Sequence, residues 1–306
     1  MKKFIDICQF SLVLMGLMVC GLFVTSLLGM LPLGAPGSPA MQWTIFAGQN
    51  IIAFILPAML AWKICFKASP IMAIEADKAP SARMIGIAVL VYLIAMPALN
   101  QTVYWNQEMH LPEAFSAFEQ WCREMEALAE QQTEALLNTD NVWHMIMNIL
   151  VIGVLTGIGE EFFFRGALQR MLEHCKVNPH IAIWTAAIVF SLLHFQFFGF
   201  VPRVLLGAWF GYLYRWSGSI WVNSFAHALN NSLVILSAWC INHGLTPEGL
   251  DMTGVSESGF PTWAMASAIA TGITLWLINR RHPLAPDNEL PPTLPTNTDS
   301  NATESN

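Results

Sequence analysis

The sequence predicts an all-α fold, a polytopic membrane helix bundle of about eight transmembrane helices with an amphipathic extracytoplasmic helix. Of the 306 residues, 55% are hydrophobic and only 11% are charged, whereas soluble globular proteins carry about 25% charged residues. The apolar residues also gather into stretches of roughly 20, which is the length that a helix needs to cross a bilayer. Because the chain has no basic patch or stripe, we expect no nucleic-acid partner.

The apolar stretches define the predicted spans in chain order. The first stretch follows Lys2 and Lys3 and is too long for the apolar region of a signal peptide, which has about 7–15 residues, so we interpret it as an uncleaved span. The sixth stretch is short. The predicted spans are residues 4–31, 43–66, 85–100, 143–168, 180–198, 201–214, 220–239 and 263–278.

The distribution of Lys and Arg predicts the orientation of the chain. With these spans, the basic loops and both termini fall on one side, which the positive-inside rule assigns to the cytoplasm. The opposite side receives loops 31–42, 101–142 and 241–261, and its only basic residues are Arg123 and Arg203. We therefore predict an integral membrane protein with both termini cytoplasmic. We expect the membrane to be a bacterial inner (plasma) membrane.

The long loop 101–142 has a helical pattern of its own. Its apolar residues recur at steps of three and four, which predicts an amphipathic helix between residues 111 and 137. The polar face is acidic, whereas helices that bind anionic lipid are rich in Lys and Arg. We therefore expect the apolar stripe to pack on the bundle as an outer cap. The stripe consists of Phe115, Phe118, Cys122, Met125, Ala129 and Leu136.

The fourth span carries three charged residues, although a charge inside a membrane costs at least ~2.5–3.5 kcal/mol and marks a candidate functional group. Glu161 and Arg165 are four residues apart, so they can pair on one helix face. Glu160 points about 100° away from Glu161, on the face of Gly153 and Gly157, where another helix can approach closely. We interpret Glu160 as a chemical group that faces the bundle interior, and Glu161–Arg165 as an ion pair that braces the bundle.

Two further segments carry polar groups in apolar surroundings. His194 lies near the end of the fifth span, and a lone histidine in that setting is more typical of a core residue than of a catalyst. Asn223, His227 and Asn231 are spaced by four and form a polar stripe on the seventh span. Such a stripe can bind an oxyanion or a metal, or can hold helices together. The estimated depths along the spans are compatible with a single site.

These residues form three motifs in order along the chain: EExxxR with Glu160, Glu161 and Arg165, FxxxH with His194, and HxxxN with His227 and Asn231. The set resembles the CPBP family, the CAAX-protease and bacteriocin-processing intramembrane endopeptidases, also called the ABI family. This family includes the type II CAAX prenyl endopeptidases. The resemblance covers about residues 141–236. No HExxH or GxSxG motif is present.

The resemblance implies a role for each motif residue. Glu160 would be the general base that activates water, and His194 would assist that water or bind a metal that holds it. His227 and Asn231 would stabilise the tetrahedral oxyanion. Glu161 and Arg165 would support the site. Glu160, His194 and His227 would be the ligands of a zinc ion, if one is present, and the same groups also suffice for metal-free catalysis.

The resemblance also implies a function and a domain organisation. We expect hydrolysis of a peptide bond in a peptide or protein substrate beside the lipid bilayer, in a cavity entered from the cytoplasmic side. The alternatives are a non-catalytic membrane scaffold or bacteriocin-immunity factor, and a transporter or proton relay. The predicted parts are transmembrane helices in residues 1–100, the acidic loop 101–142, a catalytic membrane core 143–280 and a disordered cytoplasmic tail 281–306.

Overall fold

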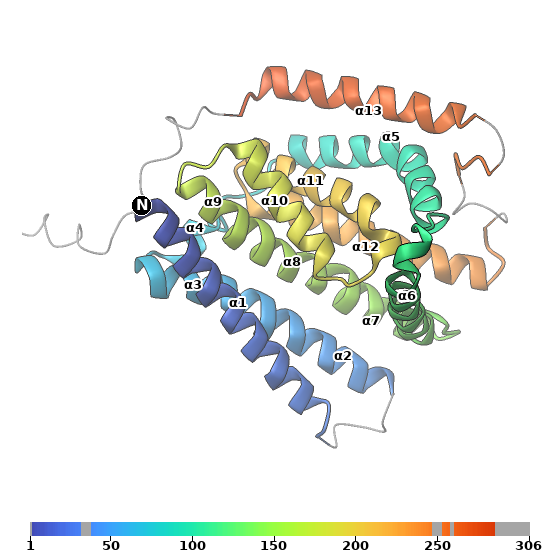
Figure 1. Cartoon of the computed structure of the whole chain (residues 1–306), viewed down its shortest axis with the longest axis horizontal. Coiled ribbons are helices and arrows are strands. Elements are labelled where there is room, and N and C mark those ends of the chain that lie inside the picture. Colours follow the sequence, from blue (N-terminus) through green and yellow to red (C-terminus); the bar gives the residue numbers. More distant parts are fainter. Residues whose placement is uncertain (1, 32–37, 247–252, 258–259, 285–306) are drawn as a thin grey trace, which may run out of the picture.

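The structure, a computed structural model of the whole chain, describes residues 2–31, 38–246, 253–257 and 260–284. Within these residues every regular element is a helix, so the predicted all-α class is confirmed. The helices lie side by side in a bundle, with the N-terminus at one end (Figure 1). The predicted disorder of the tail concerns mostly residues 285–306, which lie outside the described residues.

The N-terminal helices form an outer layer on one side of the bundle. α1 (Lys2–Leu28) packs on the second span, which runs through α2 (Pro39–Gly48), η1 (Gln49–Ile55) and α3 (Leu56–Phe66). The approach is close, because a Cβ added at Gly21 would lie 2.5 Å from the carbonyl oxygen of Ile52. This layer packs in turn on the central helix of the bundle.

The central helix extends over the 33 residues Val142–His174 and is not regular. It comprises α7 (Val142–Asn148), a π-helical segment η3 (Ile149–Leu155), α8 (Thr156–Glu161), a second π-helical segment η4 (Phe162–Gln169) and α9 (Arg170–His174). Segments with π-helical turns are rare and frequently occur at functional sites. The EExxxR motif spans the junction of α8 and η4.

The remaining spans cover the other side of the central helix. α10 (Pro179–Leu192), α11 (Phe200–Ser217) and α12 (Ile220–Asn242) pack against it and against one another. α5 (Ala82–Gln107) packs on α11 and α12, and α13 (Thr262–Arg281) packs on α5 as the outermost helix (Figure 1). The short helix α4 (Pro70–Ala73) and the turn before α10 lie at the same end of the bundle as the N-terminus.

The described residues contain seven helices that are long and apolar enough to cross a membrane, together with the shorter apolar helix α10. Several predicted boundaries differ from the structure: α5 and the central helix extend past their predicted ends, and α10 ends at Leu192, whereas the fifth span was expected to extend to residue 198. The chain turns there because Phe195 adopts a left-handed backbone with φ of 53°. The sixth span then begins at η5 (Phe197–Gly199) and is longer than expected.

The predicted amphipathic helix is present as α6 (Ser116–Leu137), preceded by η2 (Glu113–Phe115). α6 lies across the end of the bundle that is far from the N-terminus (Figure 1). Its stripe covers the bundle only in part. Cys122 and Leu136 are buried, whereas Phe115 and Phe118 are 58% and 47% exposed. The stripe therefore packs closely on the bundle at Cys122 and Leu136, and its first two phenylalanines are more exposed than expected.

Candidate active site

A pocket of about 390 Å³ brings the three motifs together. Glu160 reaches it from α8, His194 from the turn after α10, and His227 and Asn231 from α12. The four side chains come from two helices and the turn after a third, so only the folded bundle brings them together. Glu161 and Arg165 do not line the pocket and lie fully buried behind it.

Glu160 faces both histidines. One carboxylate oxygen lies 3.4 Å from Nε2 of His227, and the other lies 4.0 Å from Nε2 of His194. The Glu160 side chain is 12% exposed, so it retains a small opening toward the pocket. The carboxylate therefore stands between two imidazole nitrogens at a place that a water molecule can reach.

His227 is fixed by contacts with two aromatic rings and at one nitrogen. Its Nδ1 lies 2.8 Å from a carboxylate oxygen of Glu161. The ring stacks on Phe210 with the centroids 4.7 Å apart and meets the ring of Phe190 edge-on. Because an ionised carboxylate only accepts hydrogen bonds, Nδ1 of His227 carries the proton, and Nε2 is left to face Glu160.

Glu161 is the centre of a fully buried hydrogen-bond network. Arg165 donates to Glu161 over 2.6 Å, and the amide of Asn223 donates to its other carboxylate oxygen over 2.6 Å. Arg165 also donates to the carbonyl of Gly207 and lies over the ring of Phe190. Buried charges need such partners, because removing one of them leaves the other uncompensated. Asn223 was noted in the polar stripe but was not assigned to the site.

The network continues along the central helix as a row of buried polar residues at steps of four. Gln169 donates to the carbonyl of Gly211 on α11 and to the carboxylate of Glu173. Glu173 also lies 3.6 Å from the guanidinium of Arg215 on α11. Since Arg165 uses Gly207 in the same way, the central helix and α11 are joined through polar contacts over three turns.

His194 is oriented by the backbone of its own motif. Its Nδ1 lies 2.8 Å from the carbonyl oxygen of Phe190, which can only accept, so Nδ1 carries the proton and Nε2 faces Glu160. The rings of Phe190 and His194 also meet edge-on at 4.8 Å. The phenylalanine of FxxxH therefore contacts both histidines and Arg165.

Asn231 lines the pocket with a weakly engaged amide. Its Nδ2 lies 3.5 Å from the carbonyl of Ile152, at the limit of a hydrogen bond, and its Oδ1 accepts from the amide of Asn230 at 3.0 Å. α12 stands close to the central helix at this level because Gly157 meets the backbone of Ala228. A Cβ added at Gly157 would lie 2.8 Å from the Ala228 nitrogen.

The pocket extends toward the end of the bundle where α6 lies. Its lining includes Gln107 at the end of α5, Glu126 of α6 and Arg203 near the start of α11. The basic loops of the predicted cytoplasmic side lie at the opposite end (Figure 1) and contribute no lining residue. With the predicted orientation, these lining residues lie at the extracytoplasmic end, whereas the expectation was a cavity entered from the cytoplasm.

The three candidate metal ligands do not form a tetrahedral set as they are placed. Ligands about 2.1 Å from a tetrahedral zinc ion lie about 3.4 Å apart. The contact between Glu160 and His227 matches this value, but Nε2 of His194 is 4.0 Å from Glu160. Throughout the described part of the chain, no group of three or more His, Cys, Asp or Glu residues is arranged to hold a metal ion.

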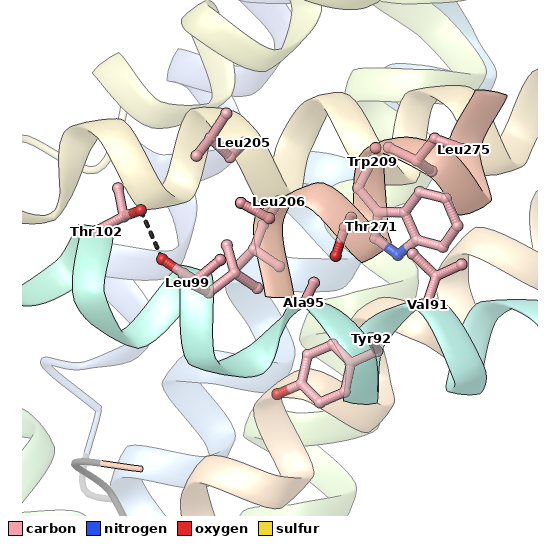
Figure 2. A pocket seen from close by; sticks show the side chains of 13 residues that line it. Val91, Tyr92, Ala95, Leu99, Thr102, Leu205, Leu206, Trp209, Thr271 and Leu275 are labelled. Carbon is pink, nitrogen blue, oxygen red and sulfur yellow. Dashed lines mark hydrogen bonds between the residues drawn. The ribbon is translucent and has the colours of Figure 1, made fainter. Parts of the chain in front are cut away.

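A second pocket of about 330 Å³ lies between α5, α11 and α13 (Figure 2). It is lined mainly by apolar side chains and contains none of the motif residues. Leu206 lines both pockets, so its side chain separates the apolar pocket from the candidate active site.

Comparison with known proteins finds similarity in one segment of the chain. Residues 142–233 match the family described as type II CAAX prenyl endopeptidase Rce1-like. The uncharacterized protein YpbD of Bacillus subtilis (strain 168) is 31% identical over 86 residues, which are 27% of this chain and 41% of that protein. The match therefore spans less than half of that relative's length. No solved structure matches the chain.

Proposed function

We propose, from the premise that residues 142–233 are an Rce1-like segment, that this chain is an intramembrane endopeptidase. It would hydrolyse a peptide bond of a membrane-associated or lipid-proximal substrate. The observation that carries the proposal is the position of Glu160, whose carboxylate faces Nε2 of two histidines inside a pocket. This arrangement supports general-base catalysis, because a base must be within reach of the water that it activates.

In the proposed reaction, Glu160 takes a proton from a water molecule as the water oxygen attacks the peptide carbonyl carbon. Nε2 of His194 accepts the second hydrogen of that water and so orients it. The attack produces a tetrahedral intermediate with an oxyanion. Glu160 then transfers its proton to the leaving amide nitrogen, the C–N bond breaks, and the two peptide products separate. One hydrogen of the water is then on the new amine, and the water oxygen and its other hydrogen are on the new carboxyl group.

The oxyanion requires donors that are already in position. His227 would supply one through Nε2 once that nitrogen also carries a proton, while its Nδ1–H remains held by the Glu161 carboxylate. Asn231 supplies the other, because its amide can exchange its 3.5 Å contact with the Ile152 carbonyl for the oxyanion. Glu161, Arg165 and Asn223 would hold His227 in place. No step of this mechanism passes through a metal ion.

The test compares the purified protein with Glu160→Gln and His194→Ala variants on a fluorescence-quenched peptide anchored to vesicles by an acyl chain. We expect each change to lower the rate of cleavage at least about 100-fold, since general acid–base catalysis contributes about 10²–10⁴-fold. Glu124→Gln is the matched control, because Glu124 is an exposed residue outside the pocket whose carboxylate accepts a hydrogen bond from Gln120. Full activity of Glu160→Gln would contradict the proposed base.

Two further measurements address the mechanism and its rivals. Metal analysis of the active protein, with cleavage assayed before and after chelation, should find no stoichiometric metal and no loss of rate. A zinc ion bound at one per chain and needed for cleavage contradicts the metal-free mechanism. A cellular phenotype that persists in Glu160→Gln would favour the scaffold or immunity alternative, whereas substrate captured by this variant and identified by mass spectrometry would support the protease.

A further inference from the structure

The turn that carries His194 is held by residues outside the three motifs. It extends over residues 193–199 and contains Phe195 in a left-handed conformation. Arg203 donates to the carbonyl and to the side chain of Gln196, over 3.3 and 2.8 Å. Asn106 at the end of α5 donates to the carbonyl of Phe197 over 3.2 Å. The turn therefore depends on side chains from neighbouring helices for its shape.

α6 reaches the same turn from outside the bundle. The carboxylate of Glu126 accepts a hydrogen bond from the backbone N–H of Phe198 over 3.3 Å. The guanidinium of Arg123 lies 4.2 Å from the centre of the Phe198 ring. The ring of Phe118 meets the ring of Phe197 edge-on at 6.2 Å. Three residues of one face of α6 thus contact two consecutive residues of the turn.

The contact at Glu126 satisfies a backbone group that the turn itself leaves without a partner. Phe198 belongs to the short 3₁₀ helix η5, and the first N–H groups of a helix have no acceptor within it. Glu126 supplies that acceptor from another element. Glu126 is half-buried at the edge of the pocket. Burial raises the pKa of its carboxyl group above the usual value, although the hydrogen bond from the Phe198 N–H and the charge of Arg203 each lower that pKa.

The N-terminal part of α6 is independently anchored, so the helix can act as a support. The carboxylate of Glu119 accepts hydrogen bonds from the backbone N–H of Leu111, over 2.8 Å, and from Arg123. The Leu111 N–H, together with Arg123 and His110, lowers the pKa of Glu119 to about 2, so this residue stays ionised at neutral pH. α6 is therefore fixed to the chain that precedes it and to the turn that carries His194.

We propose that Glu126 is a positioning residue of the active site, which acts through the Phe198 backbone to hold His194 beside Glu160. The inference rests on the proposed function for its catalytic consequence, but the positioning itself can be observed without activity. Glu126 lies outside the segment 142–233 that matches the family. The acidic loop then contributes a residue to the organisation of the site, in addition to covering the end of the bundle.

The first experiment measures the turn directly, in the full-length protein in detergent. Hydrogen exchange followed by mass spectrometry should show the Phe198 amide exchanging about tenfold faster in Glu126→Ala, as expected for a lost hydrogen bond to a charged group. Glu126→Gln retains an acceptor oxygen and should exchange nearly as slowly as the parent. Glu124→Ala, on the opposite side of α6, should not change the exchange of this peptide.

The second experiment reports on the histidine. Modification of His194 by diethyl pyrocarbonate, measured across a range of pH, should show a changed midpoint in Glu126→Ala and an unchanged one in Glu124→Ala. A purely structural role of Glu126 would not alter the titration of His194. If Glu126→Ala does not fold, Glu126→Asp replaces it, because the shorter side chain withdraws the acceptor from Phe198 and keeps the charge.

The third experiment uses the anchored peptide. We expect Glu126→Ala to lower kcat about tenfold with little change in KM, and Glu126→Gln to restore most of the rate. Unchanged exchange at Phe198 together with an unchanged His194 titration in Glu126→Ala overturns the inference. An altered turn with a parental kcat overturns the catalytic consequence. If the parent protein cleaves nothing, the first two experiments still decide whether Glu126 positions His194.

Discussion

Glu160 and Glu161 are adjacent in the sequence and lie in different surroundings. Glu160 faces the pocket, whereas Glu161 has no exposed surface and three donors, from Arg165, Asn223 and His227. Helical geometry alone predicts this division, because consecutive residues point about 100° apart. It cannot predict Asn223 or the carbonyl of Gly207 as partners, because those contacts depend on how α11 and α12 pack on the central helix.

The first prediction concerns the buried ion pair. Arg165→Ala leaves the Glu161 carboxylate buried without its guanidinium partner, so we expect the free energy of unfolding to fall by about 3–5 kcal/mol. Thermal unfolding of the purified protein in detergent would measure the loss. Lys78→Ala is the control, because it removes an ion pair with Glu75 in which the lysine side chain is 51% exposed. Equal effects of the two changes would contradict this account of Arg165.

At the scale of the elements, hydropathy predicts where the spans lie better than where they end. α10 stops at Leu192 although apolar residues continue to residue 200, because the backbone turns at Phe195. The residue with the left-handed backbone is Phe195, not a Gly, and no Pro lies between residues 193 and 199. Asn106, Ser191 and Arg203 hold the segment that follows, and contacts of this kind between distant residues have no periodic signal in the sequence. The same applies to the two π-helical segments of the central helix.

The second prediction concerns the contact of α8 with α12. Gly157→Ala places a Cβ 2.8 Å from a backbone nitrogen of α12, so the two helices must separate. We expect a loss of about 1–3 kcal/mol in stability, and a larger fractional loss of activity, because Glu160 and His227 lie on these two helices. Unfolding and cleavage assays on the same preparation would measure both.

Gly86→Ala on α5 is the matched control for this change, because an added Cβ there meets no atom within 4 Å. Alanine favours a helix over glycine by about 1 kcal/mol, so the control should be neutral or slightly stabilising. If Gly157→Ala behaves like Gly86→Ala, the close approach of α8 and α12 does not limit the site.

At the scale of the whole molecule, the helical class and the membrane spans follow from composition and apolar length. The three motifs also predict which segment matches a known family. The layering is not predictable in this way. Nothing in the sequence pattern places α13 on α5 rather than on the central helix, or α6 over the end of the bundle that holds the pocket. Those positions depend on shape complementarity between helices of similar composition.

The third prediction concerns the orientation in the membrane. In a cysteine-free variant, Gln131→Cys on α6 and Lys78→Cys before α5 place single thiols at exposed positions on either side of one span. If basic loops face the cytoplasm, an impermeant maleimide added to intact cells should label position 131 and should label position 78 only after lysis. Labelling of position 78 alone would reverse the orientation. Labelling of both would show that α5 does not cross the membrane.

The row of buried polar residues on the central helix also constrains biosynthesis. Arg165 and Gln169 take acceptors from α11, and Glu173 contacts Arg215 there, yet α11 is translated later. A charged side chain alone in lipid costs about 2.5–3.5 kcal/mol on translocon-derived scales. The nascent central helix is therefore poorly suited to partition into lipid by itself. We expect it to remain beside the insertion machinery until α11 emerges, so that the two helices leave together.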